Sequence, residues 1–209
     1  VKTRGNNLIL LLAGIVETRD IESGTHVKRV QGYTSILANK LMEKYPSYKL
    51  DPETVKLIVS GSALHDVGKI GIKDAILLKP SKLSKDEFAI MKEHTTIGAS
   101  FIDSADDVWD KDYHDIIHDI VKYHHEKYDG NGYPEGLKGD EIPISAQIVS
   151  VADVFDALIN QRCYKEAYGK EIAYDMIING ECGQFNPDLI ECFKDSFDEF
   201  SKLADVLDD

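Results

Sequence analysis

The chain has 209 residues, of which 43% are hydrophobic and 29% are charged, and its formal net charge is −13 at pH 7. A chain of this length can bury one substantial core, and its composition is ordinary for a soluble globular protein. The negative charge excludes diffuse binding to a nucleic-acid polymer, which needs clustered Lys and Arg. A small anionic substrate still fits if local cations offset the overall field.

The longest apolar run, residues 8–16, is too short to cross a bilayer and has no features of a secretory leader, so we expect no membrane insertion. The three cysteines, Cys163, Cys182 and Cys192, show no CxxC spacing. They indicate packing thiols in a reducing, cytoplasmic compartment. Because the first residue is Val1 rather than Met, we expect an upstream regulatory domain of the sensory or receiver kind.

Helical patterns run through nearly the whole chain. By apolar spacing, the predicted helices cover residues 6–19, 25–45, 50–66, 84–102, 112–125, 145–159, 170–179 and 187–207. Asp51 and Ser145 are expected as N-caps, and Ser84 with Glu87 is typical of a capping box. Strand signals are weak, and the best of them, at residues 70–72, is very short. The sequence therefore predicts an all-α bundle.

Two histidines continue apolar helical faces. His94 lies four residues after Ile90 on such a face, so its imidazole is expected to point into the bundle. His124 extends the apolar stripe that contains Ile120, and His125 lies about 100° further around the predicted helix. A single helical histidine is more often a surface or hydrogen-bonded residue than a ligand, so the pattern needs further members.

Those members are a His-Asp pair and a carboxylate on other helices. His65 and Asp66 end an apolar helical segment and are followed by Gly68 and Lys69. Imidazole suits Fe, Mn or Zn, and a carboxylate can bridge two ions. Asp153 lies among Val, Ala and Phe on its own helix, where a buried carboxylate needs a partner or a metal. Together these residues predict a site for divalent transition metals.

His114 and His118 have the i, i+4 spacing of a zinc pair, but their neighbours argue against a metal site. Asp115, Asp119 and Lys122 surround them with charge, which indicates a solvated helix face. We therefore leave both histidines out of the expected ligand set.

Longer motifs extend the pattern around residues 65–69. They are the triplet Gly132, Tyr133 and Pro134 within HHEKYDGNGYPEGLKGDEIP, and the segments ESGTHVKRV, MKEHTTIG and ISAQIVSVADVFDAL. With the HDxGK motif, they resemble the HD-GYP group of the HD superfamily of metal-dependent phosphohydrolases. The resemblance covers about residues 10–195 of the chain. We therefore expect a single HD-GYP domain over residues 1–209, with a C-terminal helix that reaches residue 207.

The resemblance implies an all-helical bundle around a centre of two or three divalent metal ions, commonly iron and sometimes manganese. The implied reaction is hydrolysis of cyclic di-GMP through pGpG and on to GMP. The implied metal ligands are Glu22, His26, His65, Asp66, His94, His124, His125 and Asp153. Of these, Glu22 occupies a variable position where a carboxylate implies a third ion, although its polar surroundings also suit a solvated turn residue.

The resemblance also implies roles for residues that act on the substrate. Lys69 matches the family's lysine near the scissile phosphate, and Asp66 is the ligand that can bridge ions. Arg162 and Lys165 match residues that hold the nucleotide. Tyr133 is expected either to lie against a guanine face or to pack over the rim of the bundle. Cyclic di-GMP is thus the expected partner, and a homodimer is left open.

The chemistry of phosphodiester hydrolysis agrees with these residue types. Two metal ions about 3.5–4 Å apart can share a hydroxide of lowered pKa and clamp the phosphate oxygens. Lys69 can stabilise charge on the phosphate or on the leaving oxygen. The sequence leaves two other functions open: a catalytically silent sensor of cyclic di-GMP, and a phosphodiesterase that acts on cyclic GMP-AMP.

Overall fold

The computed structural model describes residues 13–16, 18–19, 25–105, 109–160 and 167–207, and these residues are organised as helices. The α-helices are α2 (His26–Lys44), α3 (Pro52–Ser62), α4 (Asp74–Leu77), α5 (Lys85–Lys92), α6 (His94–Asp103), α7 (Lys111–Tyr123), α8 (Ile144–Ile159), α9 (Lys170–Ile178), α10 (Pro187–Asp195) and α11 (Phe197–Leu207). Three short 3-10 helices are η1 (Pro46–Tyr48), η2 (Val67–Gly71) and η4 (Gly139–Glu141). The prediction of an all-α fold is confirmed, and the described residues of the first predicted helix, 13–16 and 18–19, are helical.

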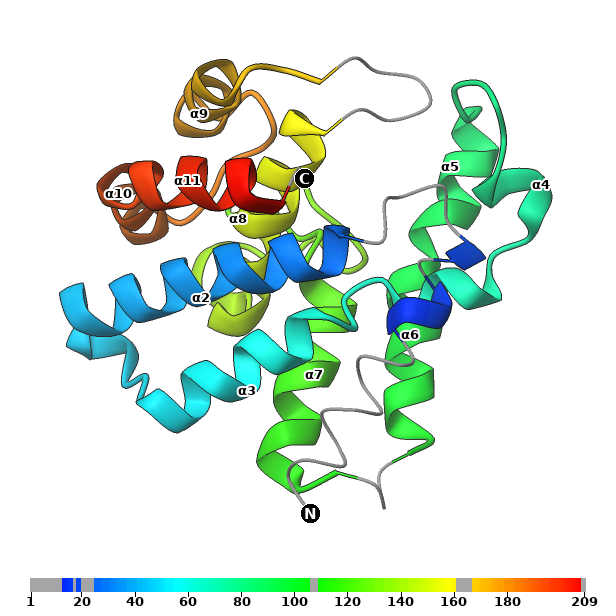
Figure 1. The fold of residues 1–209 in the computed structure, drawn as a ribbon. Helices are drawn as coiled ribbons and strands as arrows, with labels where there is room; N and C mark the ends of the chain where they lie inside the picture. Colours follow the sequence, from blue (N-terminus) through cyan, green and yellow to red (C-terminus); the bar gives the residue numbers. More distant parts are fainter. Residues whose placement is uncertain (1–12, 17, 20–24, 106–108, 161–166, 208–209) are drawn as a thin grey trace.

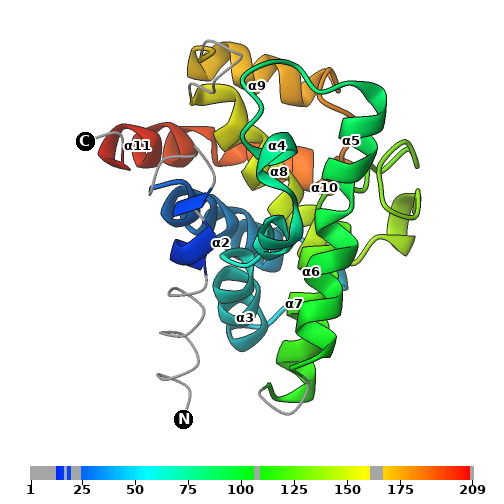
Figure 2. The same cartoon turned by 90° about the vertical axis from the view of Figure 1, so that its right-hand side faces the viewer.

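Helix α8 is at the centre of the bundle, because most of its residues are buried and they lie on all faces of the helix. It packs against α2, α7 and α9, and α2 in turn packs against α3, α10 and α11 (Figure 1). The C-terminal helices α9 to α11 lie on the opposite side of the molecule from α4 and α5 in Figure 1, and α4 lies in front of α8 in the turned view of Figure 2. Among the described residues, no helix is both long enough and apolar enough to span a membrane.

Aromatic rings fill the larger of two hydrophobic clusters, where α2, α8, α10 and α11 meet. Tyr33 stacks on Phe200 at a centroid distance of 4.7 Å and meets Phe155 edge-on at 5.2 Å. A smaller cluster, which includes Leu64 and Val121, joins α2, α3, α6 and α7. Burial of such side chains stabilises by about 1.5–3 kcal/mol each, so the two clusters hold the helices that carry the predicted ligands.

Two predicted helices are each broken into two. The segment 84–102 breaks at Glu93, whose amide donates to the carbonyl of Ile90, three residues back, at 3.0 Å. The segment 187–207 breaks at Ser196, which is fully buried. Apolar residues continue at helical spacing through both breaks, so the periodicity alone could not show them.

Other differences lie at helix ends. The weak strand signal at residues 70–72 corresponds to η2, which occupies most of this segment, and Ile72 donates its amide to the Lys69 carbonyl at 3.0 Å. A Cβ at Gly68 would overlap the carbonyl oxygen of His94, so η2 lies directly on the backbone of α6. Ser145 is inside α8 rather than its N-cap, which is Pro143, whereas the Asp51 cap and the Ser84–Glu87 capping box are confirmed.

Candidate metal centre

Three histidines are oriented by contacts between their Nδ1 atoms and backbone carbonyls. The other ring nitrogen of each, Nε2, lies near the carboxylate of Asp66. The Nδ1 atoms of His65, His94 and His124 lie 2.8, 2.8 and 3.0 Å from the carbonyl oxygens of Ser62, Met91 and Ile120. All three imidazoles are buried. A bond at Nδ1 fixes the tautomer and the ring orientation, which is how metal-ligating histidines are commonly positioned.

Asp66 lies at the centre of these rings. Its Oδ1 is 3.2 Å from Nε2 of His94 and 3.8 Å from Nε2 of His124, while its Oδ2 is 3.3 Å from Nε2 of His65. Lys69 approaches from the next turn, with Nζ 2.8 Å from Oδ2. Burial disfavours the charged carboxylate, but Lys69 and His65 hold the pKa of Asp66 well below its usual value. Asp66 is therefore a charged candidate ligand among these imidazoles.

Three buried polar atoms at this point form no hydrogen bond: Oδ1 of Asp66 and the Nε2 atoms of His94 and His124. Buried polar atoms nearly always have a partner, so a convergent trio without one calls for an explanation. Together with His125, these residues place one donor atom each within 4.8 Å of one another. Imidazole and carboxylate donors at this spacing fit a divalent transition metal.

A second donor group shares Asp66 with the first. His26, His65 and Asp66 also place their donor atoms within 4.8 Å of one another. Nε2 of His26 is 3.4 Å from Nε2 of His65, and Oδ1 of Asp153 lies 3.9 Å and 3.7 Å from these two atoms. One carboxylate common to two donor groups can bridge two ions, so the arrangement fits a dinuclear centre.

The protonation states of the imidazoles differ. Burial works against a charge on His65, but Asp66 and Asp153 together raise its pKa to about 9. Burial lowers the pKa of His124, and burial followed by the charges of His124 and His94 lowers that of His125 far below the usual value. Because a ligating imidazole must be deprotonated at the coordinating nitrogen, metal binding near neutral pH would release a proton from His65.

His125 reaches the first donor group in a way that the sequence did not predict. Helix α7 ends at Tyr123, so His125 lies beyond it and the argument from helical rotation does not apply. Its ring lies 5.2 Å from that of His94 and 4.7 Å from that of Tyr133, measured between centroids. The loop of the GYP triplet thus packs directly on a candidate ligand.

His26 is oriented by two side chains that the sequence patterns did not single out, Asp156 and Arg29. Oδ2 of Asp156 lies 2.7 Å from Nδ1 of His26, and Oδ1 receives Nε of Arg29 at 2.6 Å. All three side chains are buried. The available signal was spacing, because Asp156 follows Asp153 by three residues and Arg29 follows His26 by three, which places each pair on one helix face.

Glu126, which no sequence pattern singled out, holds the GYP loop in place. Its buried carboxylate accepts hydrogen bonds from three consecutive amides, those of Glu135, Gly136 and Leu137, at 2.7, 3.0 and 3.0 Å. The amide of Tyr133 donates to the carbonyl of His125 at 3.3 Å. The loop is therefore hydrogen-bonded to His125 and to Glu126, the residue that follows the histidine pair.

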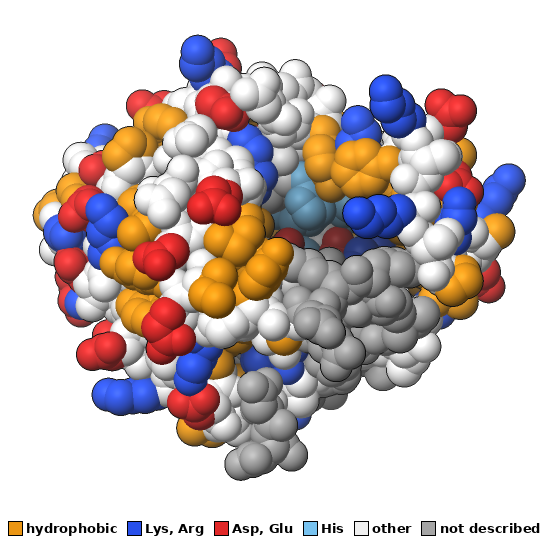
Figure 3. All heavy atoms as spheres, turned by 90° about the horizontal axis from the view of Figure 1, so that it is seen from above, with side chains coloured by type: hydrophobic (Ala, Val, Ile, Leu, Met, Phe, Trp, Pro, Cys, Tyr) orange, Lys and Arg blue, Asp and Glu red, His pale blue; other side chains and the backbone are white. Residues whose placement is uncertain are grey.

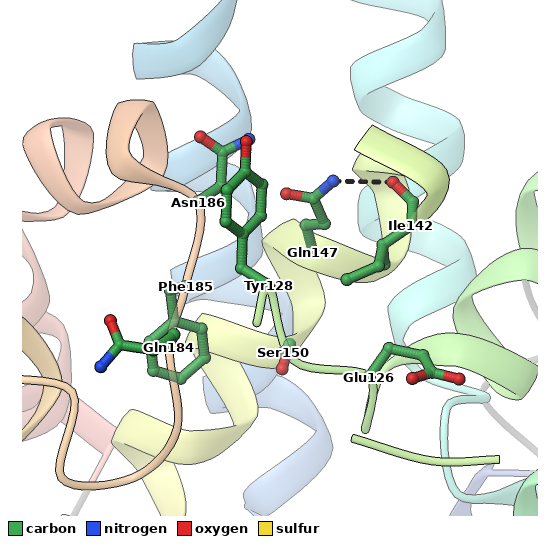
Figure 4. Close-up of a pocket in the computed structure, with 8 residues that line it drawn as sticks. All are labelled: Glu126, Tyr128, Ile142, Gln147, Ser150, Gln184, Phe185 and Asn186. Carbon is green, nitrogen blue, oxygen red and sulfur yellow. Dashed lines mark hydrogen bonds between the residues drawn. The ribbon is translucent and has the colours of Figure 1, made fainter. Parts of the chain in front are cut away.

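A small cavity of about 10 Å³ lies behind this loop, and its lining includes Glu126, Gln147 and Ser150 (Figure 4). Gln147 donates from Nε2 to the carbonyl of Ile142 at 2.7 Å, while its buried Oε1 forms no hydrogen bond. A space of this size suits one water molecule and not a substrate.

The face of the molecule seen in Figure 3 is hollowed. Histidine and acidic side chains are exposed at the floor of the hollow, and hydrophobic and basic side chains border it. Glu22, Arg162 and Lys165 lie outside the described residues, so their roles stay predictions. His114 and His118 stack on each other at 6.1 Å between centroids and belong to neither donor group, both of which were sought among the described residues alone.

Residues 24–189 match the family model of the HD domain. A cyclic di-GMP phosphodiesterase of Vibrio cholerae is 40% identical over 207 residues, which are 98% of this chain and 42% of that protein. A 3'3'-cGAMP-specific phosphodiesterase 2 of the same organism is 37% identical over 209 residues, which are 100% of this chain and 38% of that protein. This chain therefore spans less than half the length of either relative.

A solved structure, that of a cyclic GMP-AMP specific phosphodiesterase of Vibrio cholerae, has the same fold. It superposes with a TM-score of 0.67 at 17% identity and covers 97% of this chain and 50% of that chain. The family match spans most of the sequence, and the HDxGK and GYP motifs lie together at the buried His and Asp cluster. The chain belongs to the HD domain family, within its HD-GYP group.

Proposed function

We propose that this domain is a metal-dependent phosphodiesterase that hydrolyses cyclic di-GMP to pGpG and GMP. The observation that carries the proposal is the pair of donor groups that share Asp66, with the ammonium of Lys69 beside the shared carboxylate. The 40% identity to a cyclic di-GMP phosphodiesterase over nearly the whole chain supports this choice of substrate.

The residues that would hold the metal ions are the seven described donors, with Glu22 as a further ligand if a third ion binds. They are His26, His65, Asp66, His94, His124, His125 and Asp153. The mixture of imidazole and carboxylate suits iron or manganese. When bound, such ions supply a hydroxide nucleophile at neutral pH and neutralise charge on the phosphate.

Lys69 is the protein group best placed to act on the phosphate. Its side chain is 13% exposed, and its Nζ lies 2.8 Å from Oδ2 of Asp66, so it borders the donor groups without being fully buried. There it can donate to a phosphate oxygen or to the leaving oxygen as negative charge develops. We propose that Arg162 and Lys165 hold the nucleotide, and that a single domain occupies residues 1–209.

Cyclic GMP-AMP is a second candidate substrate, because the second relative is named for it and is almost as similar as the first. Both dinucleotides present the same phosphodiester to the same donor groups. The choice between them therefore depends on how the bases are held.

The test is turnover by protein purified without oxygen and loaded with Fe(II) or Mn(II). Cyclic di-GMP and cyclic GMP-AMP are supplied in parallel, and the products are separated by chromatography. We expect pGpG and GMP from cyclic di-GMP, with faster turnover than of the mixed dinucleotide. Binding of cyclic di-GMP without turnover would overturn the hydrolase and favour a sensor, and faster turnover of cyclic GMP-AMP would reverse the choice of substrate.

A further inference from the structure

Helix α5 carries an aromatic ring and a lysine, one helical turn apart, that face the GYP loop. The ring of Phe88 meets that of Tyr133 edge-on, with centroids 6.3 Å apart and planes at 83°. Nζ of Lys92 lies 5.6 Å from the centroids of both rings. Residues four apart on a helix share a face, so Phe88 and Lys92 are presented together.

Packing does not account for Phe88. Its side chain is 48% exposed, and it belongs to neither hydrophobic cluster of the described residues. Tyr133, by contrast, has the ring of His125 against it at 4.7 Å. The exposed face of Phe88 is therefore the part of this aromatic pair that is open to a planar ligand.

The aromatic pair is joined to the candidate metal centre through two routes. Along the chain, the carbonyl of Met91 on α5 holds Nδ1 of His94 at 2.8 Å. Through space, Tyr133 packs on His125, which belongs to the same donor group as His94. A ligand stacked on Phe88 would therefore lie beside the phosphate-cleaving site and not at a remote surface.

We propose that Phe88 and Lys92 form a base subsite for the cyclic dinucleotide, in which a purine stacks on Phe88 and Lys92 donates to its acceptor edge. The inference rests on the proposed function. Every base has a π-face, so stacking on an aromatic side chain contributes affinity but little selectivity. Lysine is a donor without acceptor capacity.

Lys92 supplies the selectivity in this arrangement. The N7–O6 edge of guanine carries two acceptors, whereas the corresponding edge of adenine carries one acceptor and an amino donor. An ammonium group beside the stacked base therefore favours guanine. This preference would separate dinucleotides that can place a guanine on Phe88, such as cyclic di-GMP and cyclic GMP-AMP, from cyclic di-AMP, which has no guanine.

The subsite is tested with the metal-loaded protein by measuring both KM in turnover and Kd in equilibrium binding of cyclic di-GMP. We expect Phe88→Ala to raise both by about tenfold, with metal content unchanged, and Phe88→Tyr to restore values within about twofold of the wild type. Phe101→Ala is the matched control, since Phe101 is 39% exposed on α6 and should leave both constants unchanged. Unchanged KM and Kd in Phe88→Ala would overturn the subsite while the proposed hydrolase stands.

A second measurement addresses selectivity. Lys92→Gln should reduce the preference for cyclic di-GMP over cyclic di-AMP, expressed as the ratio of the two Kd values, by about fivefold or more, because glutamine can both donate and accept. Lys85→Gln, on the first turn of α5, is the control for loss of a positive charge. An unchanged ratio of Kd values in Lys92→Gln would overturn the proposed role of Lys92 in base selectivity. If the wild type binds but does not cleave, the Kd values still test the subsite and the hydrolase alone fails.

Discussion

Asp156 and His26 are 130 positions apart in the sequence, and Oδ2 of Asp156 lies 2.7 Å from Nδ1 of His26. The same carboxylate receives Arg29, so it joins α2 to α8 where the second donor group is formed. The orientation of a candidate ligand on α2 is therefore set by α8, the most deeply buried helix.

Replacing Asp156 by Asn should weaken metal binding by about 10- to 100-fold, because the amide would no longer offer two anionic acceptors to His26 and Arg29. It should also lower the free energy of unfolding of the metal-free protein by about 3–5 kcal/mol, since Arg29 would be buried without its charge partner. Competition with a chelator and urea unfolding measure the two effects. Asp119→Asn, on the outer part of α7, is the control, and equal affinity in both variants would contradict this role.

His65→Ala and Asp66→Ala should each abolish hydrolysis of cyclic di-GMP and reduce bound metal, since each removes a donor and Asp66 serves both groups. Elemental analysis and product formation are measured on the same samples. His118→Ala should change neither quantity. A comparable loss of activity in the His118 variant would show that the centre has been misplaced.

A Glu22 variant tests whether the centre holds two metals or three. If its carboxylate holds an additional ion, the protein loaded without oxygen should contain three metals per chain, and Glu22→Ala should keep two and turn over more slowly. The metal-to-protein ratio is the readout. Two ions in both wild type and variant would remove the third metal and leave the hydrolase intact.

Gly68→Ala should be strongly destabilising, because a methyl group there would overlap the carbonyl oxygen of His94. We expect a loss of about 1–3 kcal/mol in the free energy of unfolding, together with reduced metal content as η2 moves away from α6. Gly14→Ala is the control, since a Cβ at Gly14 meets nothing within 4 Å. Equal stability of the two variants in urea would show that η2 does not pack on α6 in this way.

The start of α5 should respond to acid through Glu87. The hydrogen bonds from Lys79 and from the backbone of Ser84 lower the pKa of Glu87 from 4.5 to about 2. Because folding favours the ionised form, this contribution to stability is fully present above about pH 4.5 and is lost as the pH falls through about 2. The stability difference between wild type and Glu87→Gln should therefore shrink between pH 5 and pH 2, and a carboxyl titration near 4.5 by NMR would refute it.

Sequence analysis located the inward histidines because a ligand on a core-facing helix replaces an apolar residue in a regular pattern. His94 and His124 were found in this way, and both are buried. Spacing could place Asp156 on the same helix face as Asp153, but its contact with His26 could not be predicted, since the pairing of α2 with α8 is tertiary information. The break at Glu93 could not be predicted either. There the amide donates to the carbonyl three residues back, which ends the helix without disturbing the apolar spacing.

The weak strand signal at residues 70–72 has a related explanation. Its isoleucines suggested an extended segment, but the contact of Gly68 with the backbone of α6 requires a tight turn there. Local propensity was overridden by a packing constraint from a segment about 25 residues away, as commonly happens for short elements.

The buried carboxylate of Glu126 accepts hydrogen bonds from three successive amides of a surface loop, and Glu126 follows His125 directly in the chain. The loop therefore has little freedom to deform internally, because moving one amide away would leave a charge uncompensated in the interior. The amide of Tyr133 also donates to the carbonyl of His125 at 3.3 Å, so the loop is fixed to the histidine pair at a second place. A contact made on Tyr133 from outside is therefore separated from the candidate metal centre only by the ring of His125, 4.7 Å away between centroids.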